Sequence, residues 1–182
     1  MSTGMHDHAR MLVRRDRAGD HAAVREVIAA AFAATTPQGV PVEVGLVDAL
    51  RESAEWLPPL SLVAESDDGD IIGYVVCTRA WVDDRPALGL GPLAVAPAAQ
   101  GQGVGAALMH AVLGAADALD EPLIALLGHT DYYPRFGFRP AAELGVTPPV
   151  ADWASHFQVR TLSSYRPELQ GTFRYAQPFN EL

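Results

Sequence analysis

The chain has 182 residues, of which 49% are hydrophobic and 19% charged, a composition that excludes a disordered protein and suits a sizeable folded core. Its 22 acidic and 13 basic residues give a net charge of −9, so we expect no nucleic acid among its partners and a mild attraction for cationic small molecules or peptides. No apolar run reaches the ~20 residues of a membrane span, and the N-terminus lacks the apolar stretch of a signal peptide. The single cysteine, Cys77, cannot form an internal disulfide, so we predict a cytoplasmic protein with no membrane partner.

Residues 1–9 are polar, and we expect a flexible N-terminal tail followed by a single domain over residues 10–182. Apolar periodicity predicts a strand over 11–15, helices over 21–32 and 42–52, and a hairpin of strands over 60–65 and 71–82. Asp20 is placed to cap the first helix, and the Pro- and Gly-containing residues 35–41 form the loop between the two helices.

The second half of the chain alternates strands and helices. The patterns predict a strand over 88–95, a helix over 104–119, a strand over 123–127, a helical turn near 131–135, an extended segment over 138–141 and a strand over 156–162. We expect Phe173, Tyr175 and Phe179 to pack the end of the chain back onto the rest. This order of elements predicts an α/β sandwich around a mixed sheet.

A glycine-rich turn, Gln100-Gly-Gln-Gly-Val-Gly-Ala106, joins the strand over 88–95 to the helix that follows it. Such a turn directs several backbone N–H groups and the positive end of a helix at one point, which suits a phosphate group. It lacks the G-x-G-x-x-G spacing of a dinucleotide fold, and it cannot be a Walker loop because the chain contains no lysine. An ordinary glycine-rich turn without a ligand remains the simpler alternative.

This turn resembles the acetyl-CoA loop of the GNAT superfamily of N-acetyltransferases, whose signature is Arg/Gln-x-x-Gly-x-Gly/Ala after a strand. A second block, Tyr133-Pro-Arg-Phe-Gly-Phe138, is similar to the family's Tyr-x-x-x-Gly-Phe, and with the preceding 127–132 it looks most like the YhbS-like branch. The resemblance implies a mixed, mostly antiparallel sheet flanked by helices and splayed between the strand ending at Val95 and the one ending at Leu127. It also implies an acetyl-CoA-dependent enzyme that transfers an acetyl group to a primary amine of a small molecule or peptide, by direct attack in a ternary complex.

The resemblance also implies which residues hold the coenzyme. These are Leu93, Ala94 and Val95 on the strand edge, and Gln100, Gly101, Gln102, Gly103, Val104, Gly105 and Ala106 around the diphosphate. Pantetheine amides could pair with a strand edge, and Pro92 would mark a bulge that opens that edge. Leu93 and Val95 could equally be core residues only. Gln100 replaces the more usual arginine, which removes a charge from the phosphate site.

Tyr133 stands where many relatives place the general acid that protonates the leaving thiolate. It could instead be a buried aromatic beneath the coenzyme. Its neighbour Tyr132 is expected to pack, although a shift of one residue in the alignment would exchange the two.

Gly89 and Gly91 occupy the positions where some relatives carry histidines, so no side chain there can act as the general base. Glu43 shares a helix face with Leu46 and Leu50 and is the candidate base or acceptor-binding carboxylate. It could also form a structural pair with an arginine. His129 as a relay, or a chain of waters, are the remaining possibilities.

Three other functions are compatible with parts of this sequence. They are a non-catalytic acyl-CoA sensor, an acyltransferase using a longer acyl-CoA, and a nucleotide-binding domain that takes NAD(H). The tail residues His6, Asp7 and His8 make a poor metal site, so no metal is expected. The sequence leaves monomer or homodimer open and does not identify the amine.

Overall fold

The computed structural model describes residues 10–36 and 38–181, so the predicted tail over 1–9 lies outside it. Its strands are β1 (Met11–Arg15), β2 (Ser61–Ser66), β3 (Ile71–Val82), β4 (Arg85–Val95), β5 (Leu123–Leu127), β6 (Arg139–Pro140), β7 (Val146–Thr147), β8 (Phe157–Thr161) and β9 (Gly171–Arg174). Its α-helices are α1 (His21–Phe32), α2 (Val42–Glu52) and α3 (Val104–Ala118). Four of the short 3₁₀ turns contribute residues to the site, η3 (Pro97–Ala99), η4 (Tyr133–Phe136), η6 (Ala151–Trp153) and η7 (Gln177–Glu181).

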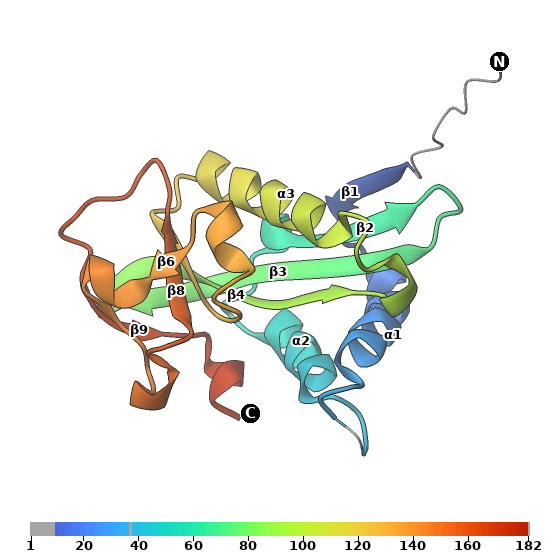
Figure 1. Cartoon of the computed structure of the whole chain (residues 1–182), viewed down its shortest axis with the longest axis horizontal. Helices are drawn as coiled ribbons and strands as arrows, with labels where there is room; N and C mark the ends of the chain where they lie inside the picture. Colours follow the sequence, from blue (N-terminus) through green and yellow to red (C-terminus); the bar gives the residue numbers. More distant parts are fainter. Residues whose placement is uncertain (1–9, 37, 182) are drawn as a thin grey trace.

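The strands form a mixed, mostly antiparallel sheet in the order β1-β2-β3-β4-β5-β8-β6. Neighbours along this path pair antiparallel except β4 and β5, which run parallel. Helix α3 covers one face of the sheet, and α1 and α2 cover the other (Figure 1). The layered α/β fold with helices on both faces therefore confirms the predicted fold class.

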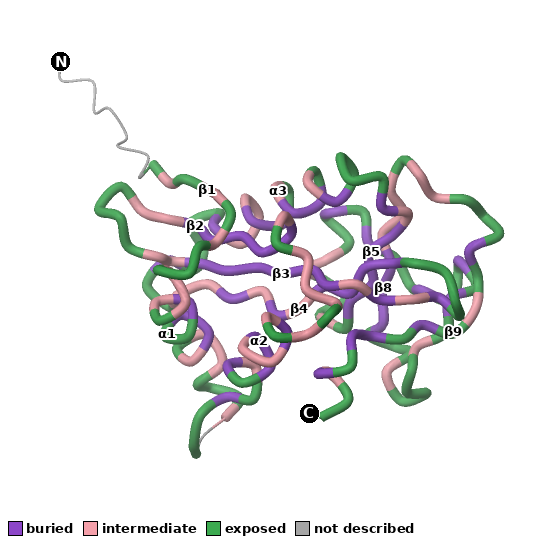
Figure 2. Tube along the Cα trace, turned by 180° about the vertical axis from the view of Figure 1, so that it is seen from behind, coloured by how far each residue is buried: buried purple, intermediate pink, exposed green. Residues whose placement is uncertain are grey.

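Buried apolar side chains fill both sides of the sheet. The stripe predicted in α1 is buried through Val24, Val27 and Ile28, which pack with Tyr74 of β3. On the other face α3 buries Leu108, Met109 and Val112 against β2 to β5. The buried segments run along β3 and β4 through the middle of the molecule (Figure 2). Burial of this kind is what holds short helices to a sheet, because isolated helices of this length are marginal in water.

Several predicted boundaries need correction. Strand β4 begins at Arg85 rather than Leu88, because it pairs with β3 around a tight turn. The extended segment expected over 138–141 is reduced to β6, and a 3₁₀ turn follows it at Ala141–Leu144. Short strands β7 and β9 were not predicted. Strand β9 pairs with β3 at Trp81 and Val82, and Phe173 and Tyr175 are buried, so the expected packing of the chain's end is confirmed.

Asp20 lies at the N-cap of α1, but its carboxylate makes no capping hydrogen bond to that helix. It accepts a hydrogen bond from the backbone N–H of Arg17 at 2.8 Å and forms an ion pair with Arg14 at 2.7 Å. The hydrogen bond from Arg14 is the main reason that the pKa of Asp20 is lowered. The predicted cap is therefore wrong, because a strand arginine takes up the carboxylate instead.

Strands β4 and β5 pair only at Leu88–Ile124 and Gly89–Ala125, so β4 has no parallel partner from there to Val95. The β3–β4 register shifts between Leu90 and Leu93, which places a bulge at Gly91 and Pro92. The bond between these two residues is cis. The expected splay and the expected bulge are therefore both present, and they leave one edge of β4 open.

None of the helices within the described ranges is long and apolar enough to cross a membrane.

Candidate functional site

Two cavities meet at the open edge of β4. The first, which we call the loop groove, has a volume of about 560 Å³ and runs along β4, the glycine-rich turn and the start of α3. Its lining residues are Ala31, Phe32, Leu93, Val95, Ala99, Gln100, Gly101, Gly103, Val104, Gly105, Ala106, His129, Tyr132, Tyr133 and Arg135. Most residues predicted to hold a coenzyme thus line a single groove.

The glycine-rich turn has the backbone that its sequence implied. Gly101 and Gly103 have φ of +74° and +84°, a left-handed conformation that other residues adopt only with strain. Gly103 is the N-cap of α3. Among the described residues, no backbone N–H of 101–106 donates to a carbonyl. The first N–H after the turn that does so is that of Ala107, which donates to the carbonyl of Gly103 at 3.0 Å. The amides of residues 101–106 are therefore free for an anion at the positive end of α3.

Two predicted residues lie outside the groove lining. The side-chain amide of Gln102 donates to the Ala98 carbonyl at 2.8 Å, on the turn itself. Ala94 is buried against α1 on the opposite side of β4. Gln100 does line the groove, but its side-chain amide donates to the Val95 carbonyl at 3.1 Å. A ligand that pairs with Val95 would therefore share that carbonyl with Gln100.

The second cavity, which we call the aromatic chamber, has a volume of about 480 Å³. Its lining residues are Phe32, Glu43, Leu46, Leu90, Gly91, Pro92, Leu93, Leu126, Leu127, Gly128, His129, Tyr133, Trp153, Tyr175 and Phe179. Leu93 and Tyr133 line both the chamber and the loop groove, as do Phe32 and His129. The two cavities therefore adjoin where β4 separates from β5.

Tyr133 begins η4 and lies at the junction of the two cavities. Its ring lies against Gly128, where an added Cβ would stand 2.4 Å from Cε2 of the ring, so a side chain at 128 would displace it. Burial, and to a smaller extent the neighbouring Tyr132, raise the pKa of Tyr133 to about 12. Its hydroxyl therefore keeps its proton at neutral pH. Tyr132 lines the loop groove but not the aromatic chamber, and its hydroxyl lies over Gly105.

Glu43 lies in the first turn of α2 and lines the aromatic chamber. Its Oε2 is buried and has no hydrogen-bond partner among the described residues. No arginine of the described chain pairs with it, since the ion pairs of α2 are made by Asp48 and Arg51 instead. A carboxylate oxygen in this state is costly unless a ligand or water supplies a donor.

Tyr175 and Phe179 are site residues that sequence reasoning did not assign. The strand glycine Gly89 makes room for Tyr175, and Gly91 lies next to Phe179. A Cβ on Gly89 would lie 2.7 Å from the Tyr175 ring, and one on Gly91 would lie 3.8 Å from the Phe179 ring. Glycine inside a strand is a known sign that another group approaches closely, and that signal was available. Of the three tryptophans, only Trp153 lines the chamber.

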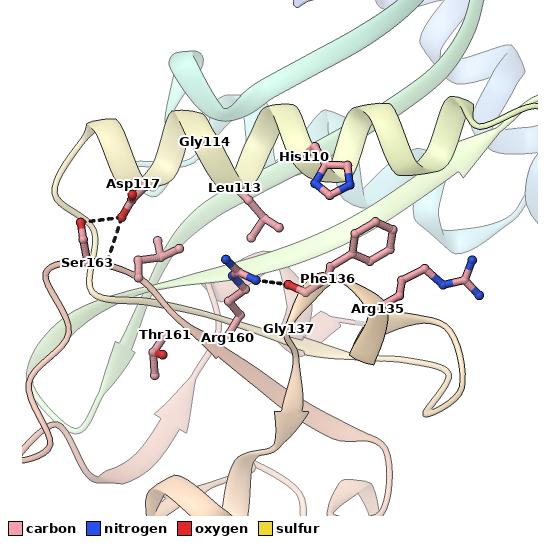
Figure 3. Close-up of a pocket in the computed structure, with 11 residues that line it drawn as sticks. His110, Leu113, Gly114, Asp117, Arg135, Phe136, Gly137, Arg160, Thr161 and Ser163 are labelled. Atoms are coloured by element: carbon pink, nitrogen blue, oxygen red, sulfur yellow. Dashed lines mark hydrogen bonds between the residues drawn. The ribbon is translucent and has the colours of Figure 1, made fainter.

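A third hollow of about 400 Å³ lies between α3, η4 and β8 (Figure 3). Arg160 of β8 donates a hydrogen bond to the carbonyl of Phe136, and Asp117 of α3 accepts hydrogen bonds from the backbone and hydroxyl of Ser163 (Figure 3). These bonds connect η4, which carries Tyr133, to β8, and the end of β8 to α3. The hollow is remote from Glu43 and shares only Arg135 with the loop groove.

In the described part of the chain there is no group of three or more His, Cys, Asp or Glu side chains that could hold a metal ion. His6, Asp7 and His8 lie outside the described residues. Cys77 is fully buried in β3, and burial raises its pKa, so its thiol is kept protonated and away from both cavities.

Comparison with known proteins places this geometry in a family. A sequence model of the acetyltransferase (GNAT) domain matches residues 59–140. The chain is 34% identical over 167 residues to the uncharacterized N-acetyltransferase YjhQ of Escherichia coli K12, covering 87% of this chain and 88% of that protein.

Solved structures agree. The crystal structure of YhbS from Escherichia coli in complex with CoA matches with a TM-score of 0.84 and 29% identity, over 94% of this chain and 93% of that one. A GNAT acetyltransferase from Brucella melitensis in complex with acetyl-CoA matches with a TM-score of 0.76 and 32% identity, over 94% and 99%. These relatives are similar to the chain in fold and in sequence over most of its length, and the chain therefore belongs to the GNAT family of N-acetyltransferases.

Proposed function

We propose that this N-acetyltransferase moves an acetyl group from acetyl-CoA to a primary amine of a small molecule or peptide, by direct attack in a ternary complex. The observation that carries the proposal is the meeting of the two cavities at Tyr133 and Leu93, beside the open edge of β4. One cavity has free backbone amides, and the other has an unpartnered carboxylate oxygen.

The loop groove fits the coenzyme. The diphosphate would accept hydrogen bonds from the amides of residues 101–106, at the positive end of the 15-residue helix α3. Pantetheine amides would pair with the main chain of Leu93 and Val95, which β5 leaves without a partner. Arg135 lines the groove and offers a cation to the anionic coenzyme. YhbS and the Brucella relative bind CoA and acetyl-CoA in their crystals, which supports the same assignment here.

The aromatic chamber would hold the acceptor, and the chain's own groups would move the protons. Glu43 receives the ammonium group and takes its proton, directly or through a water, because Oε2 has no other donor. The free amine attacks the thioester carbonyl, and a main-chain N–H of β4 beyond the bulge stabilises the oxyanion. The C–N bond forms, the C–S bond breaks, and Tyr133 donates its proton to the departing sulfur. The second proton of the attacking nitrogen then returns to the Tyr133 oxygen, directly or through water, and Glu43 releases the first proton to solvent.

Calorimetry with acetyl-CoA, followed by an assay of CoA thiol release across a panel of primary amines, tests the proposal. Binding in the micromolar range together with amine-dependent thiol release is the expected result. Binding without release for every amine would leave a coenzyme sensor and reject the transferase mechanism. Comparing acetyl-CoA with longer acyl-CoA donors in the same assay tests the preference for acetyl.

A further inference from the structure

We propose that the acceptor is a compact amine with a single positive charge on an otherwise uncharged aromatic body, and that Glu43 selects it. The inference rests on the proposed function and specifies the class of substrate for the same site. It comes from the charges and the shapes of the residues that line the aromatic chamber.

The lining of the chamber carries one carboxylate, that of Glu43, and no arginine. The chain contains no lysine, so no lining residue supplies a permanent positive charge. His129 is the other charge-bearing candidate, and it lies on the side shared with the loop groove. The chamber can therefore neutralise one cation and has no fixed cation with which to neutralise a carboxylate.

The unpartnered Oε2 of Glu43 shows where in the chamber the positive charge of the acceptor would bind. An ammonium group beside Oε2 would supply the hydrogen bond that the buried oxygen lacks, and a charged donor makes that bond stronger than a neutral one would. The carboxylate is in the first turn of α2, on the side of the chamber formed by Phe32 and Leu46. The ammonium group therefore has a specific place in the chamber.

Aromatic rings form a further part of the lining, and one of them, Phe179, packs against the buried cluster that includes Leu46. Tyr175 and Phe179 lie 4.7 Å apart between ring centroids with an interplanar angle of 34°, and Trp153 meets Tyr175 edge-on at 6.5 Å. Trp153 comes from η6. Tyr175 and Phe179 come from the last residues of the described chain, and their rings lie next to Gly89 and Gly91 of β4. Flat apolar surfaces of this kind bind a ring by stacking, and their faces also favour a nearby cation.

This lining excludes other common acceptors. A free amino acid would bring a carboxylate with no cationic partner into an apolar chamber, which is strongly unfavourable. A polyamine would bring several ammonium groups to a single carboxylate, and each further charge would lose its hydration. A basic peptide would meet the same difficulty beyond its first residue.

The test compares four probes that differ in charge and shape: phenethylamine, phenylalaninamide, phenylalanine and spermidine. Turnover is measured with acetyl-CoA, and binding by calorimetry to the complex with CoA. We expect kcat/KM for phenethylamine to exceed that for phenylalanine by at least ~100-fold, because the added carboxylate is unpaired. Phenylalaninamide has nearly the shape of phenylalanine but lacks the negative charge of its carboxylate. Its kcat/KM should therefore lie between those of phenethylamine and phenylalanine.

Glu43→Gln should lower kcat/KM and binding for phenethylamine ~10- to 100-fold while leaving the affinity for CoA unchanged. Glu52→Gln is the matched control, because Glu52 lies on the same helix, is exposed and lines neither cavity.

The outcomes separate the inference from the function on which it depends. Faster turnover of spermidine or phenylalanine than of phenethylamine would overturn the inference and leave the acetyltransferase function intact. Binding of phenethylamine that depends on Glu43, without acetylation of any probe, would support the assignment of the chamber and reject the proposed function. Unchanged binding and turnover in Glu43→Gln would reject the role of Glu43.

Discussion

Tyr133 lines both cavities, and burial raises the pKa of its hydroxyl to about 12. A phenol in that state is protonated at neutral pH, as an acid for a departing thiolate must be. We expect Tyr133→Phe to lower kcat ~100-fold or more, since general acid catalysis contributes roughly that much, with little change in the affinity for CoA. Steady-state kinetics and calorimetry measure the two quantities.

Tyr165→Phe is the control for this change, because Tyr165 lines neither cavity. If Tyr133→Phe kept the kcat of the parent protein, the hydroxyl would have no part in the reaction and the ring would serve packing alone.

The backbone at Gly103 supports a second prediction. With φ of +84° and no heavy atom within 4 Å of an added Cβ, an alanine at this N-cap would be strained by its conformation and not by crowding. We expect Gly103→Ala to cost about 1 kcal/mol of unfolding free energy and to weaken binding of CoA, because the amides of the turn would shift. Urea titration and calorimetry measure these effects.

Gly114→Ala provides the comparison within the same helix. Gly114 is exposed in the middle of α3 and also has open space around it, so alanine should stabilise the helix by up to about 1 kcal/mol and leave CoA binding unchanged. Equal effects of the two changes would contradict the role of the left-handed turn.

At the scale of elements, a hydrogen bond from strand β8 holds the 3₁₀ turn η4 in place. Arg160 of β8 donates to the Phe136 carbonyl, and its guanidinium lies where a side chain on Gly137 would stand (Figure 3). We expect Arg160→Met to lower kcat ~3- to 10-fold through the displaced Tyr133, in addition to a loss of ~1 kcal/mol in stability.

The control is Arg139→Met, since Arg139 is exposed in β6. If Arg160→Met lowered only the melting temperature, with kcat unchanged at temperatures where both proteins are folded, η4 would not need this bond to hold Tyr133.

Elements with a strong local pattern could be predicted from the sequence, whereas elements defined by distant pairing could not. Helices α1 and α3 and the long strands were predicted because each carries a strong local apolar period over many residues. The turn of residues 100–106 was predicted because the positive φ angles of Gly101 and Gly103 favour glycine, whatever the rest of the fold. Strand β9 was missed because it is short and is defined by pairing with Trp81 and Val82, far away in the sequence. The aromatic wall of the chamber depends on that distant pairing, so only its packing role was predicted.

At the scale of the whole molecule, buried tyrosines make stability depend on alkaline pH. Burial raises the pKa of Tyr74, Tyr133 and Tyr175 above the ordinary value. These groups stay neutral in the folded protein, whereas in the unfolded chain they ionise near about pH 10. Their contribution to stability is therefore complete below about pH 10 and is lost as the pH rises through the folded-state values.

We expect the urea midpoint to be nearly constant between about pH 8 and pH 9 and to fall above about pH 10. Tyr74→Phe should make that fall less steep, since it removes one of the three phenols. It should also lower the midpoint at neutral pH, because Tyr74 shares a hydrogen bond of 2.9 Å with Ser61. A slope that does not change in Tyr74→Phe would mean that this phenol is not the cause.

The aromatic chamber is built from two parts of the sequence. Leu90 to Leu93, Leu126 to His129 and Tyr133 lie within the segment 59–140 that matches the family model, whereas Phe32, Glu43, Leu46, Trp153, Tyr175 and Phe179 lie outside it. The segment that carries the turn over 100–106 therefore builds only part of the proposed acceptor cavity. Under the proposed function, substitutions at Trp153, Tyr175 or Phe179, which line the chamber and not the loop groove, would redirect the enzyme to new amines without altering the glycine-rich turn. Protein engineering could change the specificity in the same way, by replacing the segments around Trp153 and Phe179 and keeping residues 59–140.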